Sequence, residues 1–318
     1  MQRATEGARD FQSRAPSVVE TLVVDVDCDG ARRIPVFLVR EDDVLLRNGA
    51  GLSGDQAGAL LEADRTRISN IEAGRIDVSR NRLYKLLREY GCPDGPYFDG
   101  LMAMAQERGT GWWDEFCGFI GPRARDLAEL ESRCSDIRIH EPLFIPGMFQ
   151  TEDYAHAVVT VVEQDQARVG RYVEFRRARQ RILVEPRSVP YHAIVHEAAL
   201  RVHTGGTRTM RKQLLRLIEI ARLPNVTLQV FPFERGAYAA FSRPFILFGG
   251  ASRELDTVYL EHPLRSVFLG DGEASDQYGK MFERLSELAL APVDPESAPE
   301  SHDRRDSLSL IQHIMYEL

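Results

Sequence analysis

One short segment brings together four polar side chains with the chemistry needed to read the base edges of DNA. They are Arg65, Thr66, Arg67 and Asn70. Arginine donates two parallel hydrogen bonds to guanine, asparagine pairs with adenine through its amide, and threonine contacts a thymine methyl group or a phosphate. In a helix, Ile68 and Ile71 would lie together on the opposite face and pack inward. The spacing therefore predicts a DNA-recognition helix.

The same segment begins a strongly basic part of the chain. Between positions 65 and 88 there are seven basic residues and two acidic ones, although the whole chain has a formal net charge of -8. The basic residues are Arg65, Arg67, Arg75, Arg80, Arg82, Lys85 and Arg88. An acidic protein can still bind nucleic acid through one local basic face. Because phosphate contacts supply most non-specific affinity for DNA, we expect Arg75, Arg80 and Arg82 to contact the backbone.

Two capping residues predict the helices that position this segment. Ser53 is a good N-cap for a first helix, and Asp64 is a good N-cap for the helix that carries the four polar side chains. A tight turn joins the two helices, and the small residues Ala57 and Gly58 allow them to cross closely. The region from 36 to 92 is therefore predicted to be an all-helical helix-turn-helix domain.

These motifs resemble the Xre, or lambda-repressor-like, helix-turn-helix family. The resemblance rests on Leu52-Ser53, on the run Arg65–Arg75 and on the run Leu83–Tyr90. It implies that the four polar side chains of the second helix read bases in double-stranded DNA. It also implies that Ser53, Gln56 and Arg75 contact phosphates and that Glu72 is structural.

Four positions depart from the usual pattern of that family. Asp43 stands in place of a core leucine, Gly54 in place of glutamine, Gly58 in place of alanine and Glu62 in place of the turn glycine. A glycine inside a helix costs about 1 kcal/mol relative to alanine. The departures leave an alternative open: an antitoxin-like interaction module that sequesters a small protein partner, with weak or vestigial DNA binding.

The rest of the chain is predicted to form a larger domain of helices and a mostly antiparallel sheet, which makes the fold class α+β. Strand-like runs rich in β-branched and aromatic residues lie at Val189–His196, Val226–Phe231, Phe245–Phe248 and Val258–Glu261. Helical spacing is found at Leu127–Ile137, Tyr154–Val162 and Arg208–Arg222. We expect an N-terminal extension at 1–35, the helix-turn-helix domain at 36–92, an effector or dimerisation domain at 93–292, a linker at 293–306 and a C-terminal helix at 307–318.

A second resemblance covers this larger domain. Its motifs include Pro146–Ala155, Arg176–Gln180, Glu197–Arg201, Val226–Pro232 and Val258–Glu261. They resemble the C-terminal domain of the antitoxin-like, WhiJ-like Xre regulators of streptomycetes and their relatives. The resemblance implies an actinobacterial regulator, and it implies a small protein partner encoded nearby.

Polar residues inside these apolar motifs suggest an effector pocket or a partner groove. The candidates are Gln150, Tyr154, Glu197, Arg201 and Glu261. Aromatic-lined clefts with a few polar groups are typical ligand sites. The alternative is an ordinary aromatic core with no ligand.

Enzymatic and metal-binding motifs are incomplete in this sequence. His196-Glu197 begins like a zinc protease motif, but Leu200 occupies the position of its second histidine. The run Asp25–Gly30 begins like an EF-hand loop, but Val36 stands where the closing glutamate belongs. No phosphate-binding loop or nucleophile elbow occurs. We expect a protein that is not an enzyme and has no cofactor and no metal.

Composition indicates a cytoplasmic protein. No apolar stretch approaches the roughly 20 residues of a membrane helix, and no secretory leader is recognised. The four cysteines are scattered without a CxxC pair, so neither a disulfide framework nor a zinc site is expected. The sequence thus predicts a cytoplasmic, sequence-specific DNA-binding transcriptional regulator, homodimeric, whose C-terminal domain senses a ligand or a small protein.

Overall fold

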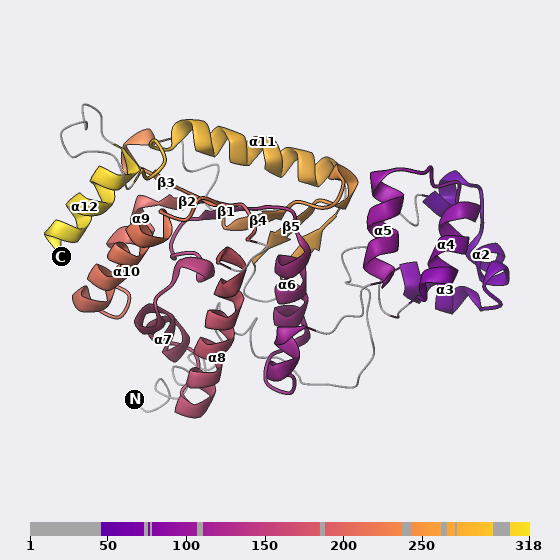
Figure 1. The fold of residues 1–318 in the computed structure, drawn as a ribbon, viewed down its shortest axis with the longest axis horizontal. Coiled ribbons are helices and arrows are strands. Elements are labelled where there is room, and N and C mark those ends of the chain that lie inside the picture. Colours follow the sequence, from indigo (N-terminus) through magenta and orange to yellow (C-terminus); the bar gives the residue numbers. More distant parts are fainter. Residues whose placement is uncertain are drawn as a thin grey trace, which may run out of the picture.

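The computed structural model describes residues 46–72, 76, 78–106, 111–184, 188–236, 243–261, 266–270, 272–294 and 306–318. The chain forms a small helical part followed by a larger part of helices and one sheet, as Figure 1 shows. The α+β fold class predicted from the sequence is confirmed. Asp43 and Arg75 lie outside the described residues, as does the predicted extension at 1–35.

After a helical stretch at residues 46–49, four helices follow in the described residues of the helical part. They are α2 (Gly54–Leu60), α3 (Arg65–Glu72), α4 (Arg80–Glu89) and α5 (Pro96–Gln106). Apolar side chains of all four meet in one core, with Ile68 of α3 fully buried at its centre and Leu87 of α4 beside it. The core reaches Met102, so α5 belongs to the same packed unit as the first three helices.

The larger part is built on a six-stranded mixed sheet. Its strands are β1 (Ile137–Glu141), β2 (Tyr191–His196), β3 (Val226–Phe231), β4 (Phe245–Phe248), β5 (Thr257–Leu260) and β6 (Val267–Leu269). Their order in the sheet is β3-β2-β1-β4-β5-β6. The pairings β1–β2 and β2–β3 are parallel, and β1–β4, β4–β5 and β5–β6 are antiparallel. Three of these five pairings are antiparallel, as the sequence predicted for most of the sheet, and the two parallel pairings make the sheet mixed.

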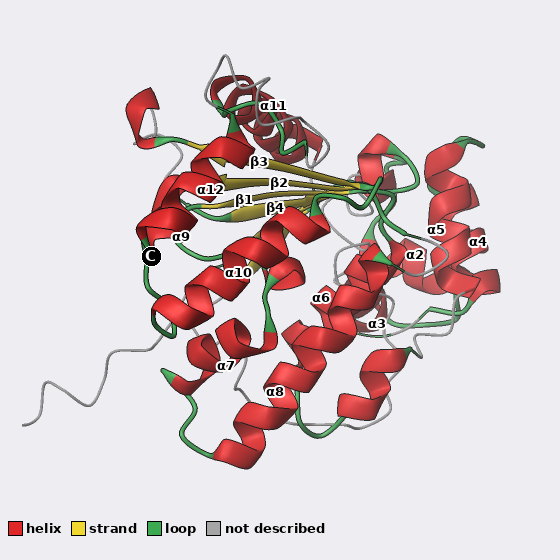
Figure 2. Cartoon of the chain, turned by 60° about the vertical axis from the view of Figure 1, so that its left-hand side comes forward, coloured by secondary structure: helices red, strands yellow, loops and turns green. Residues whose placement is uncertain are grey.

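Helices cover both faces of this sheet (Figures 1 and 2). On one face lie α6 (Pro122–Arg133), α7 (Glu152–Thr160), α8 (Gln166–Arg179), α9 (Glu197–Arg201), α10 (Thr207–Ile220) and α12 (Ser307–Glu317). On the other face lies α11 (Gly272–Leu288), whose Phe282 and Leu285 pack on Ile194 and Val258. Short 3-10 helices η2 (Trp112–Phe116), η3 (Gly147–Phe149), η4 (Gln180–Leu183), η5 (Phe233–Arg235) and η7 (Arg253–Leu255) connect them.

One element differs in kind from the prediction. The run Leu127–Ile137 was expected to be helical, but α6 ends at Arg133, and Cys134 already has extended backbone angles. Ile137 then begins β1, which pairs with both β2 and β4 in the middle of the sheet. Buried Ile137 and Ile139 alternate with half-buried Arg138, which is the pattern of a strand. The prediction of a helix over this run overlooked that alternation.

The helical part contacts the larger part through α5 and η7, the turn between β4 and β5. Leu255 of η7 belongs to the apolar core of the helical part. A Cβ added at Gly100 of α5 would lie 2.5 Å from Leu255 Cδ1, so a glycine is needed for this close approach. The turn between two sheet strands is thus packed directly on the helix-turn-helix core.

No helix among the described residues is long and apolar enough to span a membrane. Cys92 and Cys134 are buried thiols. Cys117 is disulfide-bonded, a feature that the scattered cysteines did not indicate.

Candidate nucleic-acid interface and ligand cavity

The N-terminus of α2 is fixed by a reciprocal cap. Ser53 Oγ accepts a hydrogen bond from the Gln56 backbone N at 3.2 Å, and Gln56 Oε1 accepts one from the Ser53 backbone N at 2.7 Å. Such a capping box satisfies amide groups that have no partner within the helix. Both residues are exposed. The two predicted phosphate contacts therefore lie together at a rigid helix end.

Helix α3 places its polar residues as the recognition hypothesis expects. Asp64 Oδ1 accepts a hydrogen bond from the Arg67 backbone N at 2.7 Å, which fixes the start of the helix. Ile68 and Ile71 are buried. Three of the predicted base-reading residues, Arg65, Thr66 and Arg67, are exposed, and Asn70 is half-buried. One face of α3 therefore anchors the helix while the other presents hydrogen-bonding groups to solvent.

Glu72, at the end of α3, is part of a buried clamp. Its Oε1 accepts hydrogen bonds from Arg47 Nε at 2.7 Å and from the Tyr90 hydroxyl at 3.2 Å. The Glu72 side chain is only 6% exposed and that of Arg47 is 14% exposed. This clamp ties α3 to the chain before α2 and to the end of α4, as expected for a structural glutamate.

Three of the residues that depart from the Xre pattern lie in or beside the turn between α2 and α3, and the geometry there accounts for them. A Cβ on Gly58 would lie 2.5 Å from the Ala63 carbonyl oxygen, so only glycine lets the chain turn this tightly. A Cβ on Gly54 would meet Arg65 Cγ at 3.0 Å, so the arginine stem occupies that space. Glu62 adopts a left-handed conformation with φ of 52°, where glycine is usual.

The remaining predicted phosphate contacts lie at the start of α4. Arg80 and Arg82 are both exposed in its first turn. Their guanidinium groups, like those of Arg65 and Arg67, have no carboxylate within 4.0 Å among the described residues. These cations are therefore available to a polyanion without first breaking an ion pair.

The larger part contains a cavity of about 940 Å³ between the sheet and helices α6, α7 and α8. Its sheet wall comes from β1, β2, β4 and β5, through side chains such as Ile137, Ile139, Ile246 and Phe248. Helix α7 adds Val158, and the residue that caps its C-terminus, Val161, also lines the cavity. The volume and the mostly apolar walls are typical of a small-molecule site.

Charged side chains are concentrated in part of this cavity. Arg179 and Glu131 form a two-point pair, with Nε to Oε2 at 2.9 Å and Nη2 to Oε1 at 2.5 Å. Arg176 Nη1 donates to Gln150 Oε1. Glu141 and Glu261 also line the cavity. Among the described residues, neither of these two carboxylates has a hydrogen-bond or ion-pair partner.

Burial changes the acidity of these groups. Desolvation raises the pKa of Glu141 well above its ordinary value, and the negative charge of Glu261 raises it further. Part of Glu261 is exposed to solvent, yet desolvation also raises its pKa, and the charges of Arg176 and Arg179 offset this only in part. Burial lowers the pKa of Arg176 to about 10, and neighbouring Arg179 adds to that effect. The charged forms of all three groups are therefore poorly stabilised in the empty cavity.

The five predicted effector residues separate into two places. Gln150 and Glu261 line the cavity, and Gln150 also donates from Nε2 to the Ile145 carbonyl at 2.7 Å. Tyr154 is fully buried and does not line the cavity, and its hydroxyl accepts a hydrogen bond from the Ile145 backbone N at 3.3 Å. The sequence did not single out Glu141 or Arg176 as an effector residue, because they are brought together only where α8 packs over β1.

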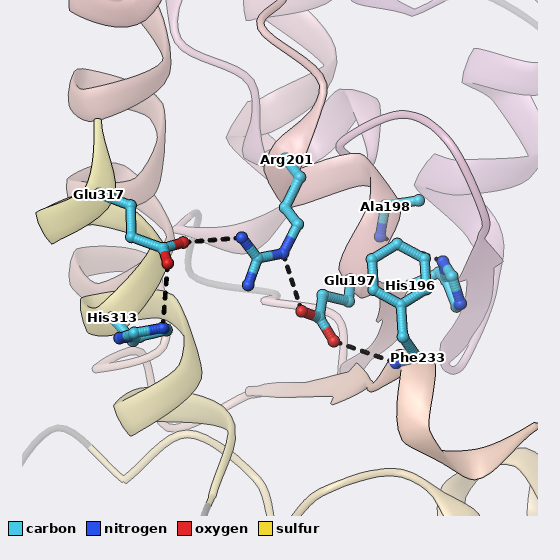
Figure 3. Close-up of polar contacts among 7 residues, drawn as sticks. All are labelled: His196, Glu197, Ala198, Arg201, Phe233, His313 and Glu317. Atoms are coloured by element: carbon cyan, nitrogen blue, oxygen red, sulfur yellow. Dashed lines mark hydrogen bonds and ion pairs between the residues drawn. The ribbon is translucent and has the colours of Figure 1, made fainter.

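Glu197 and Arg201 lie elsewhere, between α9 and α12 (Figure 3). Arg201 donates from Nε to Glu197 Oε1 at 2.8 Å and from Nη1 to Glu317 Oε2 at 2.7 Å. Glu197 Oε2 accepts from the Phe233 backbone N at 3.0 Å. These residues connect the C-terminal helix to the body of the domain.

His196 ends β2 and caps α9, where its Nδ1 accepts a hydrogen bond from the Ala198 backbone N at 3.1 Å. The pair His196-Glu197 therefore marks the junction of a strand and a helix. Among the described residues, no cluster of three histidine, cysteine or acidic side chains is placed to hold a metal ion.

Taken together, α2, the tight turn and the exposed polar face of α3 define a protein of the helix-turn-helix class, with a DNA-binding domain. Residues 45–96 match a family described as a helix-turn-helix domain. Residues 124–296, more than half of the chain, match a family described as a domain of unknown function, DUF5753. The chain belongs to this second family. Neither the comparison with curated proteins nor that with solved structures finds a match.

Proposed function

We propose that this protein is a sequence-specific transcriptional regulator that inserts α3 into the major groove of double-stranded DNA. The observation that carries the proposal is the division of α3 into two faces. Ile68 and Ile71 are buried, while Arg65, Thr66 and Arg67 are exposed. A recognition helix needs this arrangement, because base contacts come from side chains that are not used in packing.

The regulator is of the Xre type, with a C-terminal domain like that of the WhiJ-like group, and it acts in the cytoplasm as a non-enzymatic homodimer. A symmetric dimer would place two recognition helices about 34 Å apart, one turn of the duplex. The phosphate contacts come from Ser53, Gln56, Arg75, Arg80 and Arg82. The cap at Ser53 and the exposed guanidinium groups of α4 support this assignment.

An effector role for the C-terminal domain is part of the proposal. Strands β4 and β5 form part of the cavity wall, and the turn between them carries Leu255, which packs in the helix-turn-helix core. A molecule that changes the position of these strands would therefore act on α5 directly. This physical connection supports sensing by the larger domain.

The alternative function, sequestration of a small protein partner with vestigial DNA binding, was motivated by Gly54, Gly58 and Glu62. In the structure these residues form a compact turn, and the reciprocal cap at Ser53 is intact. The departures are thus compatible with a competent DNA-binding motif. No feature of the described residues favours the alternative over DNA binding.

A gel-shift titration against the DNA upstream of the protein's own gene tests the proposal. Arg65→Ala and Arg67→Ala should each weaken specific binding by about 1–3 kcal/mol, roughly 5- to 150-fold in Kd. Arg222→Ala is the matched control, because it removes one exposed positive charge from the larger part. Unchanged affinity in both α3 variants, with native circular dichroism, would refute the assignment. Absence of any shift by the wild-type protein at low salt would favour the sequestration alternative.

A further inference from the structure

The cavity of the larger part has apolar walls and two carboxylates that have no hydrogen-bond or ion-pair partner in the described part of the chain. We propose that it binds a small amphipathic cation, with an apolar body against the sheet and a protonated amine or guanidinium between Glu141 and Glu261. This inference deepens the proposed effector role, but its test needs no DNA. Failure of the binding test and failure of DNA recognition are therefore separate outcomes.

The apolar part of the cavity is large enough for such a body. Its volume of about 940 Å³ lies at the upper end of the range for small-molecule sites. Ile139 of β1 and Ile246 of β4 are neighbours in the register, and Ile246 is next to Tyr259 of β5. These side chains form a continuous apolar surface opposite Val158 and its neighbours on α7.

The sheet register brings the two carboxylates to the same end of the cavity. His140 pairs with Phe245 across β1 and β4, and one step further the same register places Glu141 beside Pro244. The β4–β5 register, continued from the Ile246–Tyr259 pair, places Glu261 on the other side of Pro244. Neighbouring strands are about 4.8 Å apart, so the two backbone positions are separated by roughly 10 Å. The charge of Glu261 reaches Glu141, whose pKa it raises.

The positive groups nearby offset this pair only in part: Arg176 acts on both carboxylates and Arg179 on Glu261, but desolvation outweighs them and the pKa of each carboxylate stays raised. Arg179 is already bound at two points by Glu131. Arg176 donates to Gln150 rather than to either carboxylate. Arg243 also lines the cavity but is exposed, and it is not among the charges that act on Glu261. Among the residues that the structure describes, the two carboxylates have no hydrogen-bond or ion-pair partner, and the guanidinium groups left near them are Arg176, which is bound to Gln150, and the exposed Arg243.

This arrangement is costly in the empty protein and favourable with a cation bound. A carboxylate surrounded by protein loses hydration, and a like charge nearby adds repulsion. A bound cation would offset both effects and hold the carboxylates in their charged form. An anion would meet the opposite conditions, because two carboxylates would repel it while Arg179 is bound to Glu131, Arg176 is bound to Gln150 and Arg243 is exposed to solvent.

Calorimetric titration of the full-length protein at pH 7.5 with three eight-carbon probes tests the proposal. Octylamine is a cation at this pH, octanoate is an anion, and octan-1-ol is neutral. We expect octylamine to bind at least about 10-fold more tightly than octan-1-ol, because its ammonium group would contact the carboxylates. We expect octanoate to bind most weakly, because the carboxylates would repel it. Equal affinity for all three probes, a preference for octanoate, or no binding of any probe to folded protein would overturn the proposal.

A double substitution separates the carboxylates from the apolar walls. Glu141→Gln combined with Glu261→Gln should reduce octylamine affinity to that of octan-1-ol and leave octan-1-ol binding unchanged. Glu283→Gln, on exposed α11 at the opposite face of the sheet, is the control and should change neither affinity. Retained selectivity for octylamine in the folded double variant would show that the carboxylates do not select the ligand.

A measurement on the unmodified protein gives a second, independent test. The raised pKa values mean that the empty cavity retains protons at a pH where a free glutamate has lost them. Binding of a cation should therefore release protons, and the affinity should increase as pH rises. Titration near pH 6 in buffers of different ionisation enthalpy detects this release. Octylamine binding without proton release, or with equal release by octan-1-ol, would contradict the proposal.

Discussion

The recognition face of α3 and the cavity of the larger part both gather charged side chains, but they place them in opposite surroundings. Arg65 and Arg67 extend into solvent from a helix whose other face is buried. Glu141 and Arg176 lie among protein atoms that shift their pKa values in opposite directions. The exposed arginines of α3 change the free energy of unfolding little, whereas the enclosed charges of the cavity lower it.

The difference indicates how each region is used. Exposed cations keep their hydration until they meet a polyanion, so the folded protein is stable without DNA. Enclosed charges lack full hydration, and Glu141 has no ion-pair partner among the described residues, so the cavity gains most when a complementary group enters it. The turn at Leu255 places the two regions in contact, which connects an enclosed site to a surface site.

The largest difference in stability between two substitutions is expected within α3, between its buried face and its exposed face. Ile68→Ala should lower the free energy of unfolding by about 2–5 kcal/mol, because Ile68 is fully buried. Arg65→Ala, on the exposed face, should leave the free energy of unfolding within about 0.5 kcal/mol of the wild-type value. Urea titration measures both variants. A large loss of stability with Arg65→Ala would mean that this side chain is part of the packing and not of a free face.

The turn between α2 and α3 should be the next most sensitive place. Gly58→Ala should destabilise the protein by about 1–3 kcal/mol, because its Cβ would lie 2.5 Å from the Ala63 carbonyl oxygen. Glu62→Gly should instead stabilise it slightly, by relieving a left-handed conformation. Ala59→Gly, at an exposed helical position of α2, is the control and should cost about 1 kcal/mol. Thermal unfolding measures the stability of all three variants. A looser turn would make Gly58→Ala no more destabilising than Ala59→Gly.

The free energy of unfolding should depend on pH through Glu141 of the cavity. Glu141 has a raised pKa in the folded protein, so its protonated form is favoured by folding. Stability should fall as pH rises from the ordinary glutamate pKa through the raised value, and the loss should be complete above it. Glu141→Gln should remove this part of the pH dependence, so the variant gains stability over the wild type with increasing pH. Parallel curves from pH 4 to pH 9 would contradict the assignment.

The smallest effect is expected at the exposed contact between α9 and α12. Glu317→Gln removes the Arg201–Glu317 ion pair, whose side chains are 35% and 48% exposed. Exposed pairs contribute little because water and salt screen them. The urea midpoint should move only slightly, and not at all in 1 M salt. Leu310→Ala, from the buried face of α12, should produce a much larger shift. Comparable effects of the two changes would indicate that the ion pair holds the helix.

The sequence predicted best where one local pattern determines the structure. Ser53 and Asp64 are caps as expected, and the runs Val226–Phe231 and Phe245–Phe248 have the bounds of β3 and β4. β1 was missed because its first residue continues the apolar spacing of α6, and five residues are too few for a clear alternation. β6, with three residues, carries even less signal.

The cavity was only partly predictable. Gln150 and Glu261 are recognisable as polar residues in apolar motifs, and both line it. Their relation to Glu141 depends on the pairing of β1, β4 and β5, which joins positions more than 100 residues apart. The separation of Glu197 and Arg201 from the cavity likewise follows from the docking of α12. The spacing of residues along the chain indicates neither the pairing of these strands nor the docking of α12.

The central claim is that the exposed face of α3 reads DNA sequence. Selection of binding sites from a random duplex library, with the wild-type protein and with Arg67→Ala in parallel, tests it most directly. The account predicts that the wild type selects a defined motif and that Arg67→Ala loses the preference for one base position while keeping the others. Selection of the same motif with the same strength by both proteins would contradict the claim.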